Sequence, residues 1–324
     1  FQELGQQWWA AQAMLELAIC HSQIGDIPGA RAWFEQCAVS LPEHGDQRSL
    51  AKALRWKGFL HVRQGELDQA VGSMQEAASV YNSIGDQINI ADSMSGLGLI
   101  LLWAGRCAES LELVNQSLQI YLDLGNRYQT AFMHLIRAIV LSFMGKYLAA
   151  EDSARTSLAQ AQEFGFRRVI AASLTVRGGL GLGECGIGGA EYRQVQHQDE
   201  LGWALAALGQ ARLAQDDWHA GLACLREALQ IGLEVKAAMS IYQALGPGAV
   251  WLGRQSRPER ALEIYSLARS NPGVAHSRWF EEIYGRQVAE LVDGLPAEAA
   301  AAAQERGREL DLWETARALI QELS

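Results

Sequence analysis

With 324 residues, of which 49% are hydrophobic and 20% charged, the chain is long enough for one to three globular domains, and its composition argues against disorder. The formal charge of −10 is spread along the sequence without a basic cluster, so direct binding of nucleic acid is not expected. No apolar run is long enough to span a membrane and no signal peptide is recognisable, so we expect a cytoplasmic protein that does not contact a membrane.

From the N-terminus onward, glycine punctuates the sequence at a regular interval. Gly45, Gly85 and Gly125 recur with a constant spacing and are each followed by Asp or Asn, while Gly65 and Gly105 fall midway between them. Glycine can end a helix in the left-handed conformation, and the Asp or Asn can cap the next helix. Apolar residues recur at helical spacing between these glycines. Each unit from Gly45 to Gly85 and onward is therefore predicted to be a helical hairpin.

Two sets of small residues run through these predicted hairpins. The set in the first helix is Ala18, Gly58, Gly98, Ala138, Gly178, Gly209, Ala249 and Ala289. The set in the second helix, twelve positions later, is Ala30, Ala70, Ser110, Ala150, Ala190, Gly221, Ala261 and Ala301. Small side chains allow paired helices to approach closely. The spacing resembles the tetratricopeptide signature. The resemblance implies an all-α, right-handed superhelical solenoid of about eight hairpins. The 40-residue period of this sequence exceeds the usual period of that family, which is about 34 residues.

The register fails once, because Gly178 and Gly209 occupy equivalent positions but lie closer together than the other members of their set. We therefore expect N-terminal repeats in residues 1–177 and an irregular, Gly-rich connection with a truncated helix in 178–200. C-terminal repeats should follow in 201–293 and capping helices in 294–324. The connection is either a functional hinge or an ordinary loop.

The sequence contains no motif for catalysis or cofactor binding in the structural context that such a motif requires. Residues 181–186 match the G-x-G-x-x-G dinucleotide fingerprint, but a helical repeat precedes them where the fingerprint needs a buried strand. The seven histidines and five cysteines lack metal-ligand spacing, and neither a P-loop nor Gly-x-Ser-x-Gly occurs. We expect a non-enzyme without catalytic residues, metal or cofactor.

A candidate binding surface lies on the first helices, which line the inside of a tetratricopeptide superhelix. The residues expected there are Arg55, Phe59, Arg63, Leu99, Trp103, Phe132, Leu135, Ile139, Phe143 and Trp203. Their large apolar side chains predict a groove for an apolar peptide or small molecule, with the arginines at one end offering charged contacts. Alternatively, the same side chains pack between successive repeats.

The final segment, 294–320, resembles the ending of large bacterial regulators. In that family a short helix, a Gly-Arg-x-Leu-x-Leu turn, here residues 307–312, and a last helix close the array. With the repeats, this ending resembles the tetratricopeptide sensor arm of signal-transduction ATPases with numerous domains, such as the maltose-regulon-activator-like regulators. The resemblance implies a parent chain with an N-terminal ATPase domain. The absence of an initiator Met would suit such an excised arm.

Two functions follow as expectations. The first is a sensor domain that recognises its inducer or partner, a peptide, protein or small molecule, on the inner face of the first helices. The second is a stand-alone scaffold that mediates protein–protein interaction. A closed aromatic pocket would favour the former and an open groove the latter.

Overall fold

The protein is seen here in a computed structural model that describes residues 7–24, 26–43, 46–64, 66–180 and 198–323. The chain divides into two compact units, residues 1–126 and 127–324.

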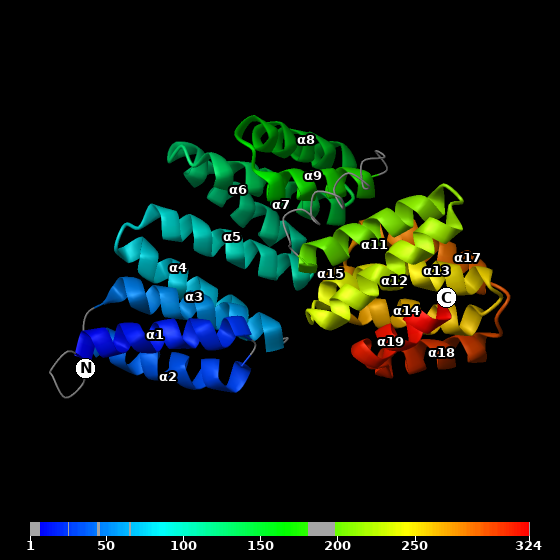
Figure 1. Cartoon of the computed structure of the whole chain (residues 1–324), viewed down its shortest axis with the longest axis horizontal. Helices are drawn as coiled ribbons and strands as arrows, with labels where there is room; N and C mark the ends of the chain where they lie inside the picture. Colours follow the sequence, from blue (N-terminus) through cyan, green and yellow to red (C-terminus); the bar gives the residue numbers. More distant parts are fainter. Residues whose placement is uncertain (1–6, 25, 44–45, 65, 181–197, 324) are drawn as a thin grey trace. The chain divides into compact units, whose positions relative to one another are not determined.

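The described part of the first unit consists of three helical hairpins (Figure 1). Its helices are α1 (Gln7–Ile24), α2 (Ile27–Glu43), α3 (Gln47–Gln64), α4 (Leu67–Ser83), α5 (Gln87–Trp103) and α6 (Cys107–Asp123). The first helix of each hairpin, here termed helix A, packs against its second helix, helix B. Helix B of one hairpin also packs against helix A of the next, as α4 does against α5. This alternation is the one predicted from the glycine spacing.

The second unit continues with further hairpins and ends in shorter helices (Figure 1). Its helices A are α7 (Arg127–Phe143), α9 (Arg167–Gly179), α11 (Gln198–Ala214) and α13 (Ala238–Arg254), and its described helices B are α8 (Tyr147–Phe164), α12 (Trp218–Glu234) and α14 (Pro258–Ser270). After them come α15 (Pro272–Ala275), α16 (Arg278–Phe280), the π-helix η2 (Glu281–Gly285), α17 (Arg286–Val292), α18 (Ala297–Glu309) and α19 (Leu312–Glu322). Helix α11 packs against both α9 and α13, so consecutive helices A lie side by side.

The glycine turns have the predicted conformation. Gly85, Gly105 and Gly125 have φ values of 68°, 76° and 64°. Asp86 then caps α5, its carboxylate accepting a hydrogen bond from the Asn89 backbone N–H. Left-handed glycine followed by a capping residue thus ends one helix and begins the next.

The small residues mark close helix contacts. A Cβ atom on Gly209 would lie 2.8 Å from Leu225 Cδ2 and 3.1 Å from the carbonyl oxygen of Gly221, its partner twelve positions later. In the first unit, the Ser110 hydroxyl donates to the Gly98 carbonyl oxygen at 2.6 Å. Seven of the eight helix A positions are buried. The approach of helix A to helix B through these positions is confirmed.

The last predicted pair of small residues, Ala289 and Ala301, is wrong. Both side chains are exposed, and α18 packs against α14 through Ala303 and Gly307 instead. A Cβ atom on Gly307 would lie 2.4 Å from the Glu263 carbonyl oxygen. Because α18 docks on the preceding hairpin, the closest contact is displaced from the position that the repeat register gives.

Most of the predicted Gly-rich connection lies outside the described residues. Helix α9 is shorter than the other helices A and stops at Gly179, and α11 starts at Gln198. Residues 181–197, which contain the G-x-G-x-x-G match and Ala190, are not described. The connection at 178–200 stays a prediction, and it does not coincide with the division between the two units at residue 126.

Candidate binding site

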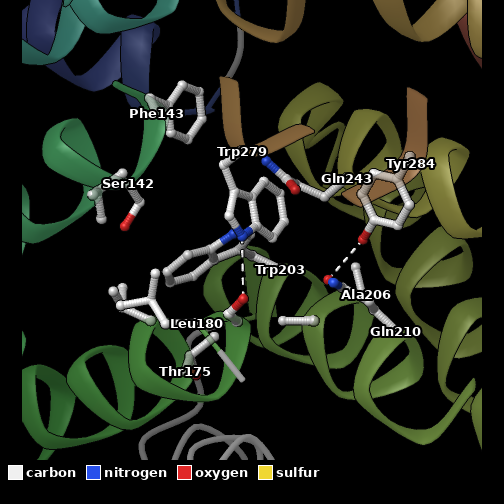
Figure 2. A pocket seen from close by; sticks show the side chains of 14 residues that line it. Ser142, Phe143, Thr175, Leu180, Trp203, Ala206, Gln210, Gln243, Trp279 and Tyr284 are labelled. Carbon is white, nitrogen blue, oxygen red and sulfur yellow. Dashed lines mark hydrogen bonds between the residues drawn. The ribbon is translucent and has the colours of Figure 1, made fainter. Parts of the chain in front are cut away.

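The second unit contains a pocket on the side where its helices A meet (Figure 2). Helices α7, α9, α11 and α13 form one wall, and the segment α16–η2 forms the other. The lining residues are Ile139, Ser142, Phe143, Thr175, Val176, Gly179, Leu180, Trp203, Ala206, Ala207, Gln210, Gln243, Trp279 and Tyr284. The pocket therefore collects one or more residues from each consecutive helix A.

Helix geometry explains why these residues meet. Ile139 and Phe143 are four positions apart at the end of α7, and Trp203 and Ala207 are four positions apart on α11, so each pair shares one helix face. Because α9 is short, its last residue, Gly179, reaches the pocket with its backbone. No side chain at Gly179 separates the pocket from the helix end.

The opposite wall is fixed by hydrogen bonds over long sequence distances. The Trp279 indole Nε1–H donates to the Gly179 carbonyl oxygen at 3.1 Å, and the Tyr284 hydroxyl donates to Gln210 Oε1 at 2.7 Å (Figure 2). The Tyr284 ring lies against α13, where a Cβ atom on Gly246 would approach it to 2.6 Å. The segment α16–η2 is thereby held against α9, α11 and α13.

The pocket is small and uncharged. Its free volume is about 40 Å³, room for roughly three water molecules beside the side chains that line it. None of its described lining residues is Asp, Glu, His, Lys, Arg or Cys. Most of the lining side chains are aromatic or aliphatic, so the pocket suits binding of an apolar group.

The predicted residues of the second unit divide between pocket and core. Ile139, Phe143 and Trp203 line the pocket, as Figure 2 shows for the two aromatic residues. Leu135 does not contribute to an open surface, because it is 2% exposed and packs among the core residues of α7, α9 and α11. Phe132 stacks on Tyr128 at 6.5 Å, with the Arg168 guanidinium 5.9 Å from its ring centre.

Tyr128, Phe132 and Phe166 belong to a separate aromatic cluster at the start of α7 and α9. The Arg168 guanidinium also pairs with Glu200 on α11. Contacts between neighbouring helices A account for this cluster. For Phe132 the structure supports the alternative of packing between repeats.

The predicted residues of the first unit lie on α3 and α5. Arg55 is not a loose charge at the end of a groove, because its Nη1 donates to Asp92 Oδ2 at 2.9 Å and thereby links α3 to α5. Tyr121 donates to the other oxygen of the same carboxylate, Oδ1, from α6. Phe59 is 36% exposed and meets Trp56 edge to face.

Leu99 and Trp103 are both partly buried on α5. Arg63 lies in α3, and its side chain is outside the described residues. The first unit thus presents some of the expected aromatic residues, and the described pocket that uses predicted residues belongs to the second unit.

Apart from Ile139, Phe143 and Trp203, the lining residues were not predicted from the sequence; Gln210, Gln243, Trp279 and Tyr284 are among those missed. Gln210 follows Trp203 by seven positions, or two helix turns, so extending the inner stripe of α11 would have found it. Trp279 and Tyr284 follow the last regular hairpin, where the repeat gives no register. The adjacent aromatic residues Trp279 and Phe280 can be recognised in the sequence, but without a repeat register they could not be placed relative to the helices A.

Metal sites and membrane-spanning helices have structural requirements that can be checked in the described part of the chain. Within the described ranges, no group of three or more His, Cys, Asp or Glu side chains could hold a metal ion. None of the described helices combines the length and apolarity needed to cross a lipid bilayer.

The helical hairpins with their close helix A to helix B contacts define an all-helical repeat array of the tetratricopeptide type. Residues 49–123 and 89–163 match the family described as tetratricopeptide repeat. A Rap protein crystallised in complex with competence and sporulation factor is similar in structure, with a TM-score of 0.65 and 13% identity, over 97% of this chain and 99% of that one.

The apo form of RapI is also similar, with a TM-score of 0.51 and 12% identity, again over 97% of this chain and 99% of that one. At such identities the likeness shows the fold alone. No curated protein matches the sequence.

Proposed function

We propose that the chain is a non-catalytic binding module that recognises a segment of another protein on the inner face of its helices A. The observation that carries this proposal is the pocket between α7, α9, α11 and α13, which contains aromatic and aliphatic side chains and no charged ones. Apolar pockets with a few fixed polar groups are the usual place for an anchoring side chain of a ligand.

The fold supports a protein or peptide as the partner. Consecutive helices A present an elongated row of side chains, and repeat arrays use such surfaces to bind extended segments. The similar Rap protein was solved as a complex with competence and sporulation factor, so this fold accommodates a separate ligand. The elongated row therefore makes a scaffold that mediates protein–protein interaction the first candidate, while the aromatic pocket is the feature expected of a sensor.

A sensor arm of a regulatory ATPase is the second candidate. Its support is the ending of the sequence, in which α18 stops at Glu309, Asp311 caps the next helix and α19 follows from Leu312. This arrangement agrees with the helix–turn–helix ending of that family. The same pocket would then receive the inducer or partner protein of the regulator.

Selection of binding peptides from a displayed random library tests the proposal, with the full chain as target. Selected peptides should bind one site in calorimetry, and Trp203→Ala should weaken that binding by about 2 kcal/mol, or roughly thirtyfold. Circular dichroism confirms that the variant keeps its helices.

Trp9→Ala is the matched control, because Trp9 is 56% exposed on α1 and belongs to the first unit, whereas the pocket residues belong to the second. Peptides that bind equally well to the Trp203 variant, or no selectable peptides at all, would contradict the proposal.

A further inference from the structure

One side chain that lines the pocket, that of Trp279, reaches across to the end of α9. Trp279 is far from Gly179 in sequence, yet its indole Nε1–H donates to the Gly179 carbonyl oxygen at 3.1 Å. A Cβ atom on Gly179 would lie 3.9 Å from Trp279 Cζ2, an ordinary contact distance, so the ring also packs against this helix end. Figure 2 shows the Trp279 side chain among the pocket residues, with its hydrogen bond drawn as a dashed line.

The contact between the Trp279 indole and the end of α9 resembles the way a pocket binds an aromatic ligand. Gly179 is the last residue of α9, where the carbonyl groups of a helix lack donors within the helix. The indole therefore offers this helix end a hydrogen-bond donor and an apolar ring together. An aromatic ring with one N–H group is the chemistry that the pocket accommodates.

The rest of the segment has further anchors besides Trp279, whose ring also meets that of Tyr284 edge to face at 5.9 Å. Phe280 is 1% exposed, stacks on Tyr265 at 5.9 Å and meets the Tyr284 ring at 4.9 Å. Tyr147, on α8, donates a hydrogen bond to Glu282. These contacts hold α16 and η2 in place whether or not the indole is seated.

Trp279 differs from these anchors because it is only partly buried, and its neighbour Arg278 is exposed. The indole thus lies at the solvent edge of the anchored segment. A change of its side-chain torsions would vacate the pocket without unfolding the segment. Buried Phe280 and Tyr284 have no such freedom.

We propose that the pocket is a site for a tryptophan side chain of the partner, and that Trp279 is the internal competitor that the partner displaces. This inference rests on the proposed function and names the anchoring group of the partner. The internal indole has a high effective concentration at the site. The apparent affinity for an external indole is the intrinsic affinity multiplied by the fraction of time that the site is free of Trp279.

Free indole is the probe for this site, with the full chain as protein. Trp279→Ala should bind one indole molecule with a Kd on the order of 1 mM or tighter, because apolar cavities of this kind take up small aromatic molecules. Binding should be at least tenfold tighter than to the wild type. Benzofuran, which lacks the N–H group, should bind severalfold more weakly than indole.

Trp313→Ala is the matched control, because Trp313 is a partly buried tryptophan that packs on the same core from α19 and does not line the pocket. Indole binding to the Trp279 variant no tighter than to the wild type, or equal binding to the Trp313 variant, would overturn the inference.

The peptides selected against the wild-type chain provide the second measurement. They should contain tryptophan and bind Trp279→Ala at least tenfold more tightly than the wild type. Equal affinity for both proteins, together with loss of binding in Trp203→Ala, would leave the binding function intact and refute the internal competitor.

The conservative variant Trp279→Phe keeps the test independent of any folding defect in the alanine variant. It identifies the Trp279 signal in the ¹⁵N-indole spectrum of the wild type by its disappearance. In the peptide complex of the wild type, that signal should move to the position of a solvent-exposed indole. An unchanged Trp279 signal at saturation would overturn the inference.

Discussion

At the scale of single residues, the turns between successive helices change composition along the chain. The turns from Gly85 to Gly165 place glycine in the left-handed conformation, whereas Asp216, Lys236 and Ser256 take φ values of 59°, 54° and 58° in the later ones. The left-handed conformation costs a residue with a Cβ atom about 1–2 kcal/mol relative to glycine. The second unit therefore contains local strain that a single substitution can relieve.

Ser256→Gly should raise the free energy of unfolding by about 0.5–1 kcal/mol, the relief of this strain minus the extra chain entropy of glycine in the unfolded state. Urea unfolding followed by circular dichroism measures the change. Gly165→Ser is the reciprocal control in the same unit, because Gly165 has a φ of 72° and open space around it. It should be destabilising by a similar amount. A stability increase in both variants would show that the conformation is not the cause.

A second prediction concerns the close contacts between paired helices. A Cβ atom on Gly98 would lie 3.0 Å from Val114 Cγ2, so Gly98→Leu should overpack the hairpin and cost about 1–3 kcal/mol or more. Gly72→Leu, on helix B of the preceding hairpin, has nothing within 4 Å and should be neutral or slightly stabilising. Thermal melts of the two variants decide the matter. Equal melting temperatures would mean that the contact at Gly98 yields without cost.

At the scale of elements, α18 and α19 are tied to α14 by a network of ion pairs. Glu263, on α14, accepts from Arg306 Nε on α18 at 2.6 Å and from Arg260 Nη1 at 3.0 Å. Arg260 also donates from Nη2 to Glu322 of α19 at 2.9 Å. The Glu263 side chain is only 14% exposed, so its pairs are better shielded from water than ordinary surface pairs.

This network makes the docking of the last helices pH-dependent. Burial alone would raise the pKa of Glu263, but the hydrogen bonds from Arg306 and Arg260 outweigh it and hold that pKa below the usual value. A lowered pKa in the folded state stabilises the fold above the unfolded-state pKa. That contribution is lost as the pH falls through the folded-state pKa.

Glu263→Gln should therefore cost about 1–2 kcal/mol at neutral pH, and its difference from the wild type should shrink as the pH falls from about 5 towards 3. Chemical unfolding across this pH range measures both effects. Glu305→Gln, which removes an exposed partner of Arg308, should cost less than about 0.5 kcal/mol. A pH-independent difference for Glu263→Gln would exclude ionisation as the cause.

The helices themselves follow from the sequence, and the segment that completes the pocket does not. Regularly spaced glycines and paired small residues predicted the hairpins because each is a local requirement of helix ends and helix pairs. Trp279 reaches its partner, Gly179, across a long stretch of sequence and from a segment outside the repeat. Long-range contacts of that kind leave no periodic trace in a sequence.

The same distinction explains which site residues were predicted. Ile139, Phe143 and Trp203 were found because they repeat on the inner stripe of helix A. Leu135 lies one turn before Ile139 on α7 and was assigned to the same stripe. At its position along the helix the side chain is covered by neighbouring helices and belongs to the core. Arg55 was predicted to offer a charged contact in the groove, whereas its side chain pairs with Asp92 of the next hairpin.

At the scale of the whole molecule, the two units differ in how their cores are built. A continuous cluster of buried residues in the second unit extends from α7 to α19. Among the described residues of the first unit, the buried side chains form smaller clusters around α1–α3, α4–α5 and α3–α5. In repeat arrays stability is a sum over repeats and their neighbouring interfaces, so smaller local cores open at lower free energy.

We therefore predict that the first unit opens before the second. Hydrogen exchange followed by mass spectrometry should show amide protons in α1–α4 exchanging at least about thirtyfold faster than those in α11–α14, which corresponds to about 2 kcal/mol less for local opening. Urea unfolding should show two steps, since arrays whose repeats differ in stability depart from two-state behaviour. Trp313→Ala, in the second unit, should shift only the later step. Uniform protection, together with coincident unfolding curves from circular dichroism and tryptophan fluorescence, would mean that the two units unfold as one.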